Sequence, residues 1–170
     1  TINAGTGVLS FIAAPDFANP TDAGGNNIYD VVVQVSDGAL TDTQAIAVTV
    51  TNVNDNTPVI TSNGGGVSAS ISVSENSTGV TTVTATDADV GDTLTYSIAG
   101  GVDAAKFIIN SSTGVLTFVA APDFESPTDV GGNNIYDVVV KVTDAIGHID
   151  TQAIAVTVTD QNEGIPVANA

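Results

Sequence analysis

The chain has 170 residues, nineteen of them acidic and only two, Lys106 and Lys141, basic, which gives a formal net charge of −17. A field of this sign repels nucleic acids and anionic membrane surfaces and attracts divalent cations, so the first two are excluded as partners. Since the chain contains no run of eighteen apolar residues, no signal peptide and no lipid anchor, we expect an internal segment of a longer protein without direct membrane insertion.

The side-chain composition favours β-structure and gives no support for an enzyme. The aliphatic residues are mainly Val, Ile and Ala, accompanied by many Thr, and such a mixture favours sheet over helix. There is no cysteine, and the single histidine, His148, is not next to a nucleophile, so we do not predict catalysis. His148 falls in a predicted hairpin, where we expect it to be exposed.

The chain contains two copies of one repeat. Residues 24–33 recur without change as residues 131–140. Self-similarity of this extent indicates tandem modules. The copies are offset by 107 to 108 residues, and further matches join residues 2–9 to 109–116, 14–17 to 121–124 and 43–51 to 151–159.

The repeats predict a domain organisation in which residues 1–58 form the C-terminal part of a first repeat, 59–163 a complete repeat, and 164–170 the start of a linker. The first copy lacks a counterpart of residues 59–108. Half a sandwich would leave one apolar face and a sheet edge uncovered. Either the sequence is a piece of a longer array, or a neighbouring chain donates the missing strands and the protein is a filament subunit.

Seven runs of alternating apolar and polar residues follow one another in the complete copy, separated by turn residues. This spacing is typical of a β-sandwich, and the fold class we predict is therefore all-β, a tandem seven-stranded sandwich with a truncated first copy. The expected strands are residues 67–73, 81–86, 93–99, 106–110, 114–119, 135–143 and 151–159.

The two-residue period of these strands also predicts the hydrophobic core, because alternate side chains point to opposite faces of a sheet. Small polar residues, mostly threonine and serine, occupy the intervening positions. The expected core residues are Ile71, Val73, Val83, Ala85, Leu94, Tyr96, Ile98, Phe107, Ile109, Leu116, Phe118, Tyr136, Val138, Val140, Val142, Ile154, Val156 and Val158.

Acidic residues concentrate in the turns, and alternating strand directions would sort these turns to two ends of the sandwich. Carboxylates gathered in this way repel one another unless a cation joins them. One end would collect Asp87, Asp89, Asp92 and Asp144, and the other would collect Glu75, Asp123, Glu125, Asp129 and residues 160–163.

Residues 52–58, Asn-Val-Asn-Asp-Asn-Thr-Pro, stand between the two copies. Carboxylate, carboxamide and carbonyl oxygens are the ligands that Ca²⁺ prefers, so the segment predicts a joint clamped by calcium. Asp and Asn are also ordinary turn residues, which is the alternative for each one taken singly. The run Gly64-Gly65-Gly66 after the joint could loosen it.

Taken together, these motifs resemble the tandem cadherin-like repeats of large bacterial surface adhesins. Val-Ser-Glu-Asn around Glu75 is similar to the glutamate motif at the end of the family's first strand, and Asp-Ala-Asp at residues 87–89 resembles its Asp-x-Asp motif. The resemblance implies a Greek-key β-sandwich, Ca²⁺ between consecutive modules, an extracellular location and an adhesive role. Further matching segments are residues 52–58, 96–98, 113–116, 123–125 and 142–144.

The resemblance also implies which residues bind calcium. Because Ala18 stands at the position of Glu125, and Asn52 where the family has Asp, the joint should bind fewer ions or bind them more weakly. The implied ligands at the joint are Asp16, Asn54, Asp55 and Asn56 from the first copy and Asp87, Asp89 and Asp144 from the second. A distal half-site is implied at Glu75, Asp123, Glu125, Asp160 and Asn162.

The function we expect is that of a structural module of an extracellular adhesin or matrix protein, made rigid by calcium and in contact with neighbouring repeats. Two alternatives remain at this stage. One is the self-assembling filament subunit, whose partners are other copies of the chain. The other is a carbohydrate-binding module that contacts surface glycans.

Overall fold

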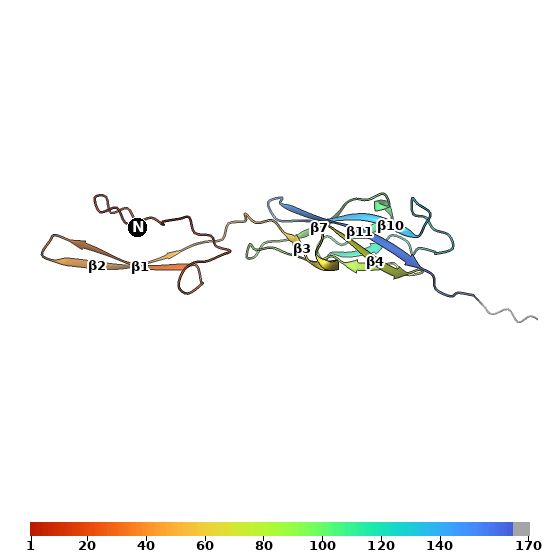
Figure 1. Cartoon of the computed structure of the whole chain (residues 1–170), viewed down its shortest axis with the longest axis horizontal. Coiled ribbons are helices and arrows are strands. Elements are labelled where there is room, and N and C mark those ends of the chain that lie inside the picture. Colours follow the sequence, from red (N-terminus) through yellow and green to blue (C-terminus); the bar gives the residue numbers. More distant parts are fainter. Residues whose placement is uncertain (165–170) are drawn as a thin grey trace, which may run out of the picture. The chain divides into compact units, whose positions relative to one another are not determined.

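The computed structural model describes residues 1–164 and shows an all-β chain (Figure 1). The chain forms two compact units, unit 1 from Thr1 to Asp55 and unit 2 from Asn56 onward. Apart from Gly164, the expected linker at residues 164–170 lies outside the described residues.

Unit 1 is built on one antiparallel hairpin. Strand β1 (Ile28–Ser36) pairs with β2 (Thr41–Thr49) along the whole length of both strands. Both strands are rich in β-branched side chains, which fit a pleated surface. Asp37 closes the turn between them, because its Oδ1 accepts hydrogen bonds from the backbone amides of Ala39 and Leu40 at 2.9 and 2.8 Å.

Unit 2 is a β-sandwich of short strands, and its strand positions agree with the sequence prediction to within a few residues in most cases. Two short 3-10 turns, η1 (Ser62–Gly64) and η2 (Ala104–Lys106), are the helical elements among the described residues. The strands are β3 (Val59–Ile60), β4 (Ser68–Ser74), β5 (Gly79–Thr82), β6 (Ala85–Thr86), β7 (Thr95–Gly100), β8 (Phe107–Ile109), β9 (Val115–Phe118), β10 (Ile135–Thr143) and β11 (Ile149–Thr159).

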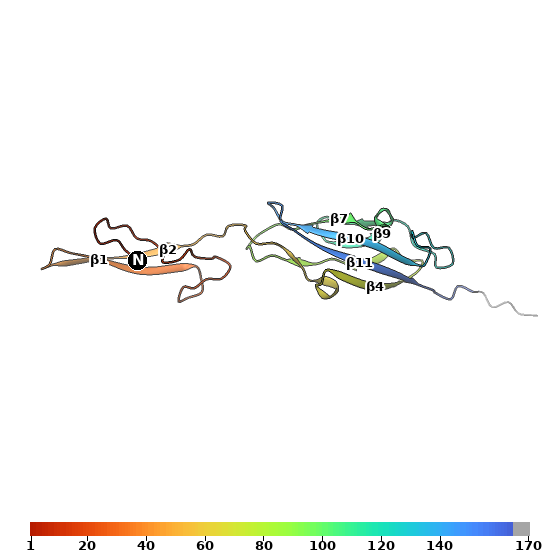
Figure 2. The ribbon, with the colours of Figure 1, turned by 45° about the horizontal axis from the view of Figure 1, so that its top comes forward.

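Two sheets form the sandwich (Figure 2). One has the strand order β4-β11-β10-β7, with β4 parallel to β11 and the other neighbours antiparallel, and the second has the order β5-β9-β8. A short pair, β3 with β6, accompanies them. Because neighbouring strands such as β4 and β11 are distant in sequence, the chain crosses between sheets, as a Greek-key connection requires.

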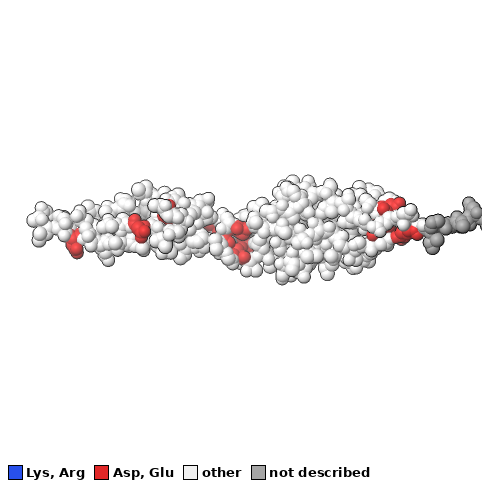
Figure 3. Space-filling view, turned by 90° about the horizontal axis from the view of Figure 1, so that it is seen from below, with Lys and Arg blue, Asp and Glu red and all other residues white. Residues whose placement is uncertain are grey.

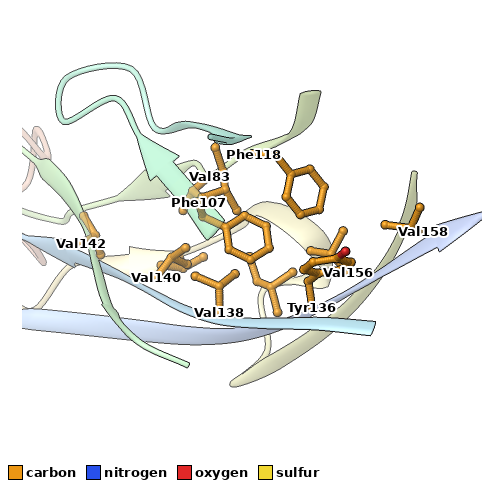
Figure 4. Packing of buried hydrophobic residues seen from close by; sticks show 12 residues of the cluster. Val83, Phe107, Phe118, Tyr136, Val138, Val140, Val142, Val156 and Val158 are labelled. Carbon is orange, nitrogen blue, oxygen red and sulfur yellow. The ribbon is translucent and has the colours of Figure 1, made fainter. Parts of the chain in front are cut away.

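The core lies between the two sheets and contains the predicted residues. Side chains from β10 and β11 face Val83, Phe107 and Phe118; those labelled in Figure 4 are Tyr136, Val138, Val140, Val142, Val156 and Val158. Ile154 and Leu116 belong to the same buried cluster. The remaining predicted positions are partly buried and pack against this cluster. The prediction omitted Ile60, which is buried, and Val80 and Phe124, which pack on the cluster.

The prediction of one strand over residues 81–86 is wrong, because β5 and β6 belong to different sheets. The amide of Val83 donates to the carbonyl of Gly114 at 2.8 Å, and the amide of Thr84 donates to Ser62 Oγ at 3.1 Å. Because of these bonds, the chain leaves the sheet of β5 and β9 after β5 and then pairs with β3 through β6. At two residues, β3 is too short to show an alternating pattern.

The glycine run 64–66 is held in place rather than left loose. Gln152, which is completely buried, donates through Nε2 to the carbonyls of Ser62 and Gly66 at 3.3 and 2.8 Å. Asn63 donates to Gln152 Oε1 at 3.2 Å and accepts from Thr81 Oγ1 at 3.0 Å. This polar cluster ties the run to β5 and β11, which the sequence alone did not indicate.

Candidate metal centre

Three aspartates gather at the end of unit 2 where its chain begins. Asp87 follows β6, Asp92 lies in the loop between β6 and β7, and Asp144 follows β10. One carboxylate oxygen from each lies within 4.8 Å of the other two, and we call these residues the Asp144 cluster. Figure 3 shows acidic side chains gathered at both ends of unit 2, with no lysine on the visible face.

Asp144 is the most buried member, with 5% of its surface exposed. Its Oδ1 accepts hydrogen bonds from the backbone amides of Ile146, Gly147 and His148 at 3.0, 2.6 and 2.7 Å, which closes the hairpin between β10 and β11. Burial acts to raise the pKa of Asp144, but these amides and the His148 ring outweigh it and lower the pKa. The hairpin therefore holds a carboxylate anion.

Asp87 and Asp92 follow the same pattern. Oδ1 of Asp87 accepts from the amide of Asp89 at 2.9 Å, and Oδ1 of Asp92 accepts from the amide of Thr93 at 2.7 Å. The second oxygen, Oδ2, is buried in all three aspartates of the cluster and accepts no hydrogen bond. Burying such oxygens without a donor is costly, and placing three of them together adds charge repulsion.

This donor set fits a hard divalent cation. All of its atoms are oxygens, and Ca²⁺ takes six to eight oxygens from carboxylates, carbonyls and carboxamides. The three Oδ2 atoms are already oriented, because each Oδ1 partner is a backbone amide of the same loop. A cation would supply the favourable interaction that the protein does not provide.

His148 lies beside this cluster, contrary to the expectation that it is simply exposed. Its side chain is 38% exposed, and Nδ1 lies 2.8 Å from Asp144 Oδ2 and 2.8 Å from the carbonyl oxygen of Asn56. Nδ1 carries at most one proton, so the two oxygens compete for it or share it. Its contact with Asp144 is an ion-pair distance without a hydrogen bond. Its position four residues after Asp144 in a hairpin was the signal available in the sequence.

Asp89 holds the beginning of unit 2. Only 4% of Asp89 is exposed, and its carboxylate accepts from the backbone amide of Asn56 at 2.8 Å and from Asn56 Nδ2 at 2.9 Å. The sequence predicted both residues as cation ligands, and the structure pairs them with each other. Asp92, which was not among the predicted ligands, joins Asp87 and Asp144 instead.

A second group, Glu75, Asp123 and Glu125, lies where the chain leaves β11, and we call it the Glu75 cluster. Glu75 is 2% exposed, and its carboxylate accepts from the amides of Gln161 and Phe124 at 2.7 and 2.8 Å. The amide of Gln161, followed by that of Phe124, lowers the pKa of Glu75. Asp123 and Glu125 are exposed.

The neighbouring carboxylates affect the pKa of Glu125. Its own backbone amide acts to lower the pKa of Glu125, but burial and the charges of Glu75, Asp160 and Asp123 outweigh it and raise the pKa. Asp160 and Asn162, the remaining predicted ligands at this end, line an open pocket together with Asp123 and Glu125. We expected Asp129 at this end of the sandwich as well, but it has another role. Its carboxylate accepts hydrogen bonds from the backbone amides of Asn133 and Asn134 at 3.0 Å, which stabilises the loop before β10.

Residues 69–159, more than half of the chain, match the Cadherin domain family. The chain belongs to the cadherin domain family. The cadherin-like fold is confirmed by solved structures, whereas no curated protein sequence matches the chain.

Three solved structures show the similarity. The Protocadherin GammaB4 extracellular domain is 29% identical over 85% of this chain, with a TM-score of 0.68. Mouse clustered PcdhgC3 EC1-3 is 26% identical over 83%, with a TM-score of 0.65, and Protocadherin Gamma B2 extracellular cadherin domains 1-5 are 25% identical over 85%, with a TM-score of 0.67. The chain spans 22%, 46% and 27% of these structures, respectively.

Membership of the family gives the general character of the chain. Cadherin domains are extracellular adhesion modules rather than enzymes, they occur as tandem repeats, and they generally bind Ca²⁺. Among residues 1–164, no helix has the length and apolar character needed to cross a membrane.

Three of the four ligands predicted from the first copy, Asp16, Asn54 and Asp55, lie in unit 1, and the fourth, Asn56, begins unit 2. Asp16 is exposed, and it accepts from the amide of Ala18 at 2.9 Å and from Asn19 Nδ2 at 2.8 Å. Asn54 has a buried side-chain oxygen without a hydrogen-bond partner, and Asp55 is exposed. Their role as calcium ligands stays a prediction.

Proposed function

We propose that this chain is a calcium-binding structural and adhesive repeat of an extracellular bacterial adhesin or matrix protein. The observation that carries the proposal is the Asp144 cluster, in which one carboxylate oxygen of each aspartate lies within 4.8 Å of the other two and each Oδ2 is buried without a hydrogen bond. The motifs shared with bacterial surface adhesins support the bacterial assignment, and the cadherin family supports the adhesive role.

The residues that would bind the cation are Asp87, Asp92 and Asp144, each through Oδ2. The resemblance in sequence also implies Asn54 and Asp55 as ligands. Asn56 itself is fixed by Asp89 and His148. A bound Ca²⁺ would supply positive charge and oxygen coordination at this end of unit 2.

Loss of the cation would leave the carboxylates of the Asp144 cluster without a neutralising charge. Like charges would face one another at the Asp144 cluster, and the segment before Asn56 would lose a partner. We therefore expect the joint between repeats to be stiff with calcium and flexible without it. Small-angle scattering of the full chain should show a broader range of dimensions in chelator than in calcium, and identical profiles would contradict this role.

Isothermal titration calorimetry with Ca²⁺ tests the site itself. Asp87→Asn and Asp92→Asn each keep the side-chain shape and remove one charge, so each should weaken binding about tenfold or more, since ligand charge count sets calcium affinity. Asp137→Asn is the matched control, because Asp137 is exposed on β10 and belongs to neither cluster. Equal affinities for all three variants would refute the proposed site.

A further inference from the structure

Asn63 and Gly64 form the one asparagine–glycine pair in the sequence. The backbone nitrogen of a glycine attacks Cγ of a preceding asparagine readily, because glycine has no side chain to hinder the approach. A bond forms between this nitrogen and Cγ, the bond from Cγ to Nδ2 breaks, and ammonia leaves with the proton of the backbone amide. Water then opens the cyclic imide to aspartate or isoaspartate. The pair is therefore a candidate site of deamidation that needs no reactant except water.

The backbone of the folded chain keeps the reacting atoms apart. Asn63 has φ 53° and ψ 34°, and Gly64 follows with φ 88°. The imide ring requires the Gly64 nitrogen and Cβ of Asn63 to lie on the same side of the bond between Cα and the carbonyl carbon. At a ψ of 34° the nitrogen lies on the opposite side from Cβ. Asn63 must therefore leave this left-handed conformation before the ring can form.

Two side chains hold the carboxamide of Asn63 in the same way. Its Nδ2 donates to Gln152 Oε1 at 3.2 Å, and its Oδ1 accepts from Thr81 Oγ1 at 3.0 Å. Gln152 is completely buried, and its Nε2 donates to the carbonyls of Ser62 and Gly66. We call Asn63, Thr81 and Gln152 the Asn63 cluster. Its hydrogen bonds must break before Cγ of Asn63 can turn toward the backbone nitrogen that follows.

Deamidation would prevent the Asn63 cluster from forming again. A carboxylate at position 63 has no proton to donate to Gln152 Oε1, so two acceptor oxygens would face each other beside a fully buried side chain. Gln152 cannot reverse its amide without releasing the carbonyls of Ser62 and Gly66. The product therefore favours the open form of the η1 turn.

We propose that Asn63 is a site of spontaneous and irreversible deamidation, which the Asn63 cluster protects while the η1 turn is closed. Local opening of this turn starts the reaction. Its rate follows the population of the open form, because opening and closing are much faster than ring formation. The site thus converts repeated opening into a lasting loss of stability. The inference goes beyond the calcium-binding role and does not depend on it.

The test measures the rate of deamidation at Asn63 in the full chain, in chelator so that calcium plays no part. Cleavage at acidic residues releases residues 56–75, whose two asparagines are Asn56 and Asn63. Mass spectrometry of this peptide locates the change from carboxamide to carboxylate, and Asn56, which precedes threonine, is the internal reference. The chain unfolded in guanidinium chloride should react at Asn63 at least about tenfold faster than the folded chain.

Variants of the Asn63 cluster should accelerate the reaction in the folded chain. Thr81→Val keeps the side-chain shape and removes the hydroxyl donor, so the rate should rise by about three- to tenfold. Gln152→Leu should raise it further, because the carbonyls of Ser62 and Gly66 also lose their donor. Val158→Ala is the control, since it weakens the core further along β11 and should change the rate by less than about threefold.

The product itself can be made as Asn63→Asp, and its melting temperature should lie about 3–10 °C below that of the parent chain. If Gln152→Leu does not fold, Thr81→Val alone decides whether the cluster protects Asn63. The proposal is overturned if the folded and unfolded chains react equally fast, or if Val158→Ala accelerates the reaction as much as Thr81→Val does. It is also overturned if Asn63→Asp melts at the same temperature as the parent chain.

Discussion

The two acidic clusters of unit 2 differ in what their buried oxygens contact. In the Glu75 cluster the buried carboxylate has its hydrogen-bond donors within the protein, the amides of Gln161 and Phe124, and the other two carboxylates are exposed. In the Asp144 cluster three buried oxygens accept no hydrogen bond, although His148 Nδ1 lies 2.8 Å from one of them, Asp144 Oδ2. A buried charge that the protein satisfies is structural, whereas one left without a donor indicates a missing ligand.

The largest difference between the clusters should appear in calcium affinity. Asp144→Asn keeps an acceptor for the three hairpin amides and removes the most buried charge of its cluster, so calcium affinity should fall by at least about tenfold. Glu125→Gln in the Glu75 cluster should change the strongest binding constant by less than about threefold. Titration calorimetry measures both, and a greater loss from Glu125→Gln would reverse the assignment.

The opposite order is expected for stability in chelator. Glu75→Ala leaves the amides of Gln161 and Phe124 without their acceptor, so the melting temperature should fall by about 5–15 °C. Asp123→Ala, in the same cluster but exposed, should change it by no more than about 2 °C. Circular dichroism melts provide the measurement, and equal effects would show that Glu75 is not structural.

The Glu75 cluster should also respond to pH. Because the folded pKa of Glu125 is raised, the stability contributed by protonating it is present below its ordinary value of 4.5 and is lost as pH rises through the folded pKa. In chelator, the urea midpoint of Glu125→Gln should therefore rise relative to that of the parent chain as the pH increases from 4.5 through the folded pKa of Glu125. A difference that stays constant with pH would show that Glu125 titrates normally.

The smallest effect is expected at His148. His148→Gln removes the ring next to Asp144 and the contact with the carbonyl of Asn56, while a polar side chain remains. Calcium affinity should change by about two- to threefold, because Asp89 still holds Asn56 through two hydrogen bonds. A loss of tenfold or more in the same titration would make His148 as important as the aspartates.

Much of the fold was predictable because each strand shows its period locally. Alternation identified core positions that are buried or packed against the core, and the corresponding strand registers of the two hairpins follow from their similar sequences. The division of residues 81–86 between two sheets and the anchoring of the glycine run by Gln152 were not predictable. Both depend on contacts with residues that are distant in sequence, such as Gly114 and Ser62.

The candidate site was predictable as a gathering of acids but not in its membership. Strand parity places Asp87, Asp89, Asp92 and Asp144 at one end, and the structure confirms that three of them converge. Which of Asp89 and Asp92 joins the cluster depends on loop geometry, because Asp89 turns toward Asn56. The contact of His148 depends on where Asn56 lies, which no local pattern reveals.

The most direct test of the account is an anomalous difference map from crystals of the full chain grown with calcium. The account predicts an anomalous peak about 2.3–2.6 Å from the Oδ2 atoms of Asp87, Asp92 and Asp144. A map with calcium bound elsewhere and no peak at these three atoms would contradict it.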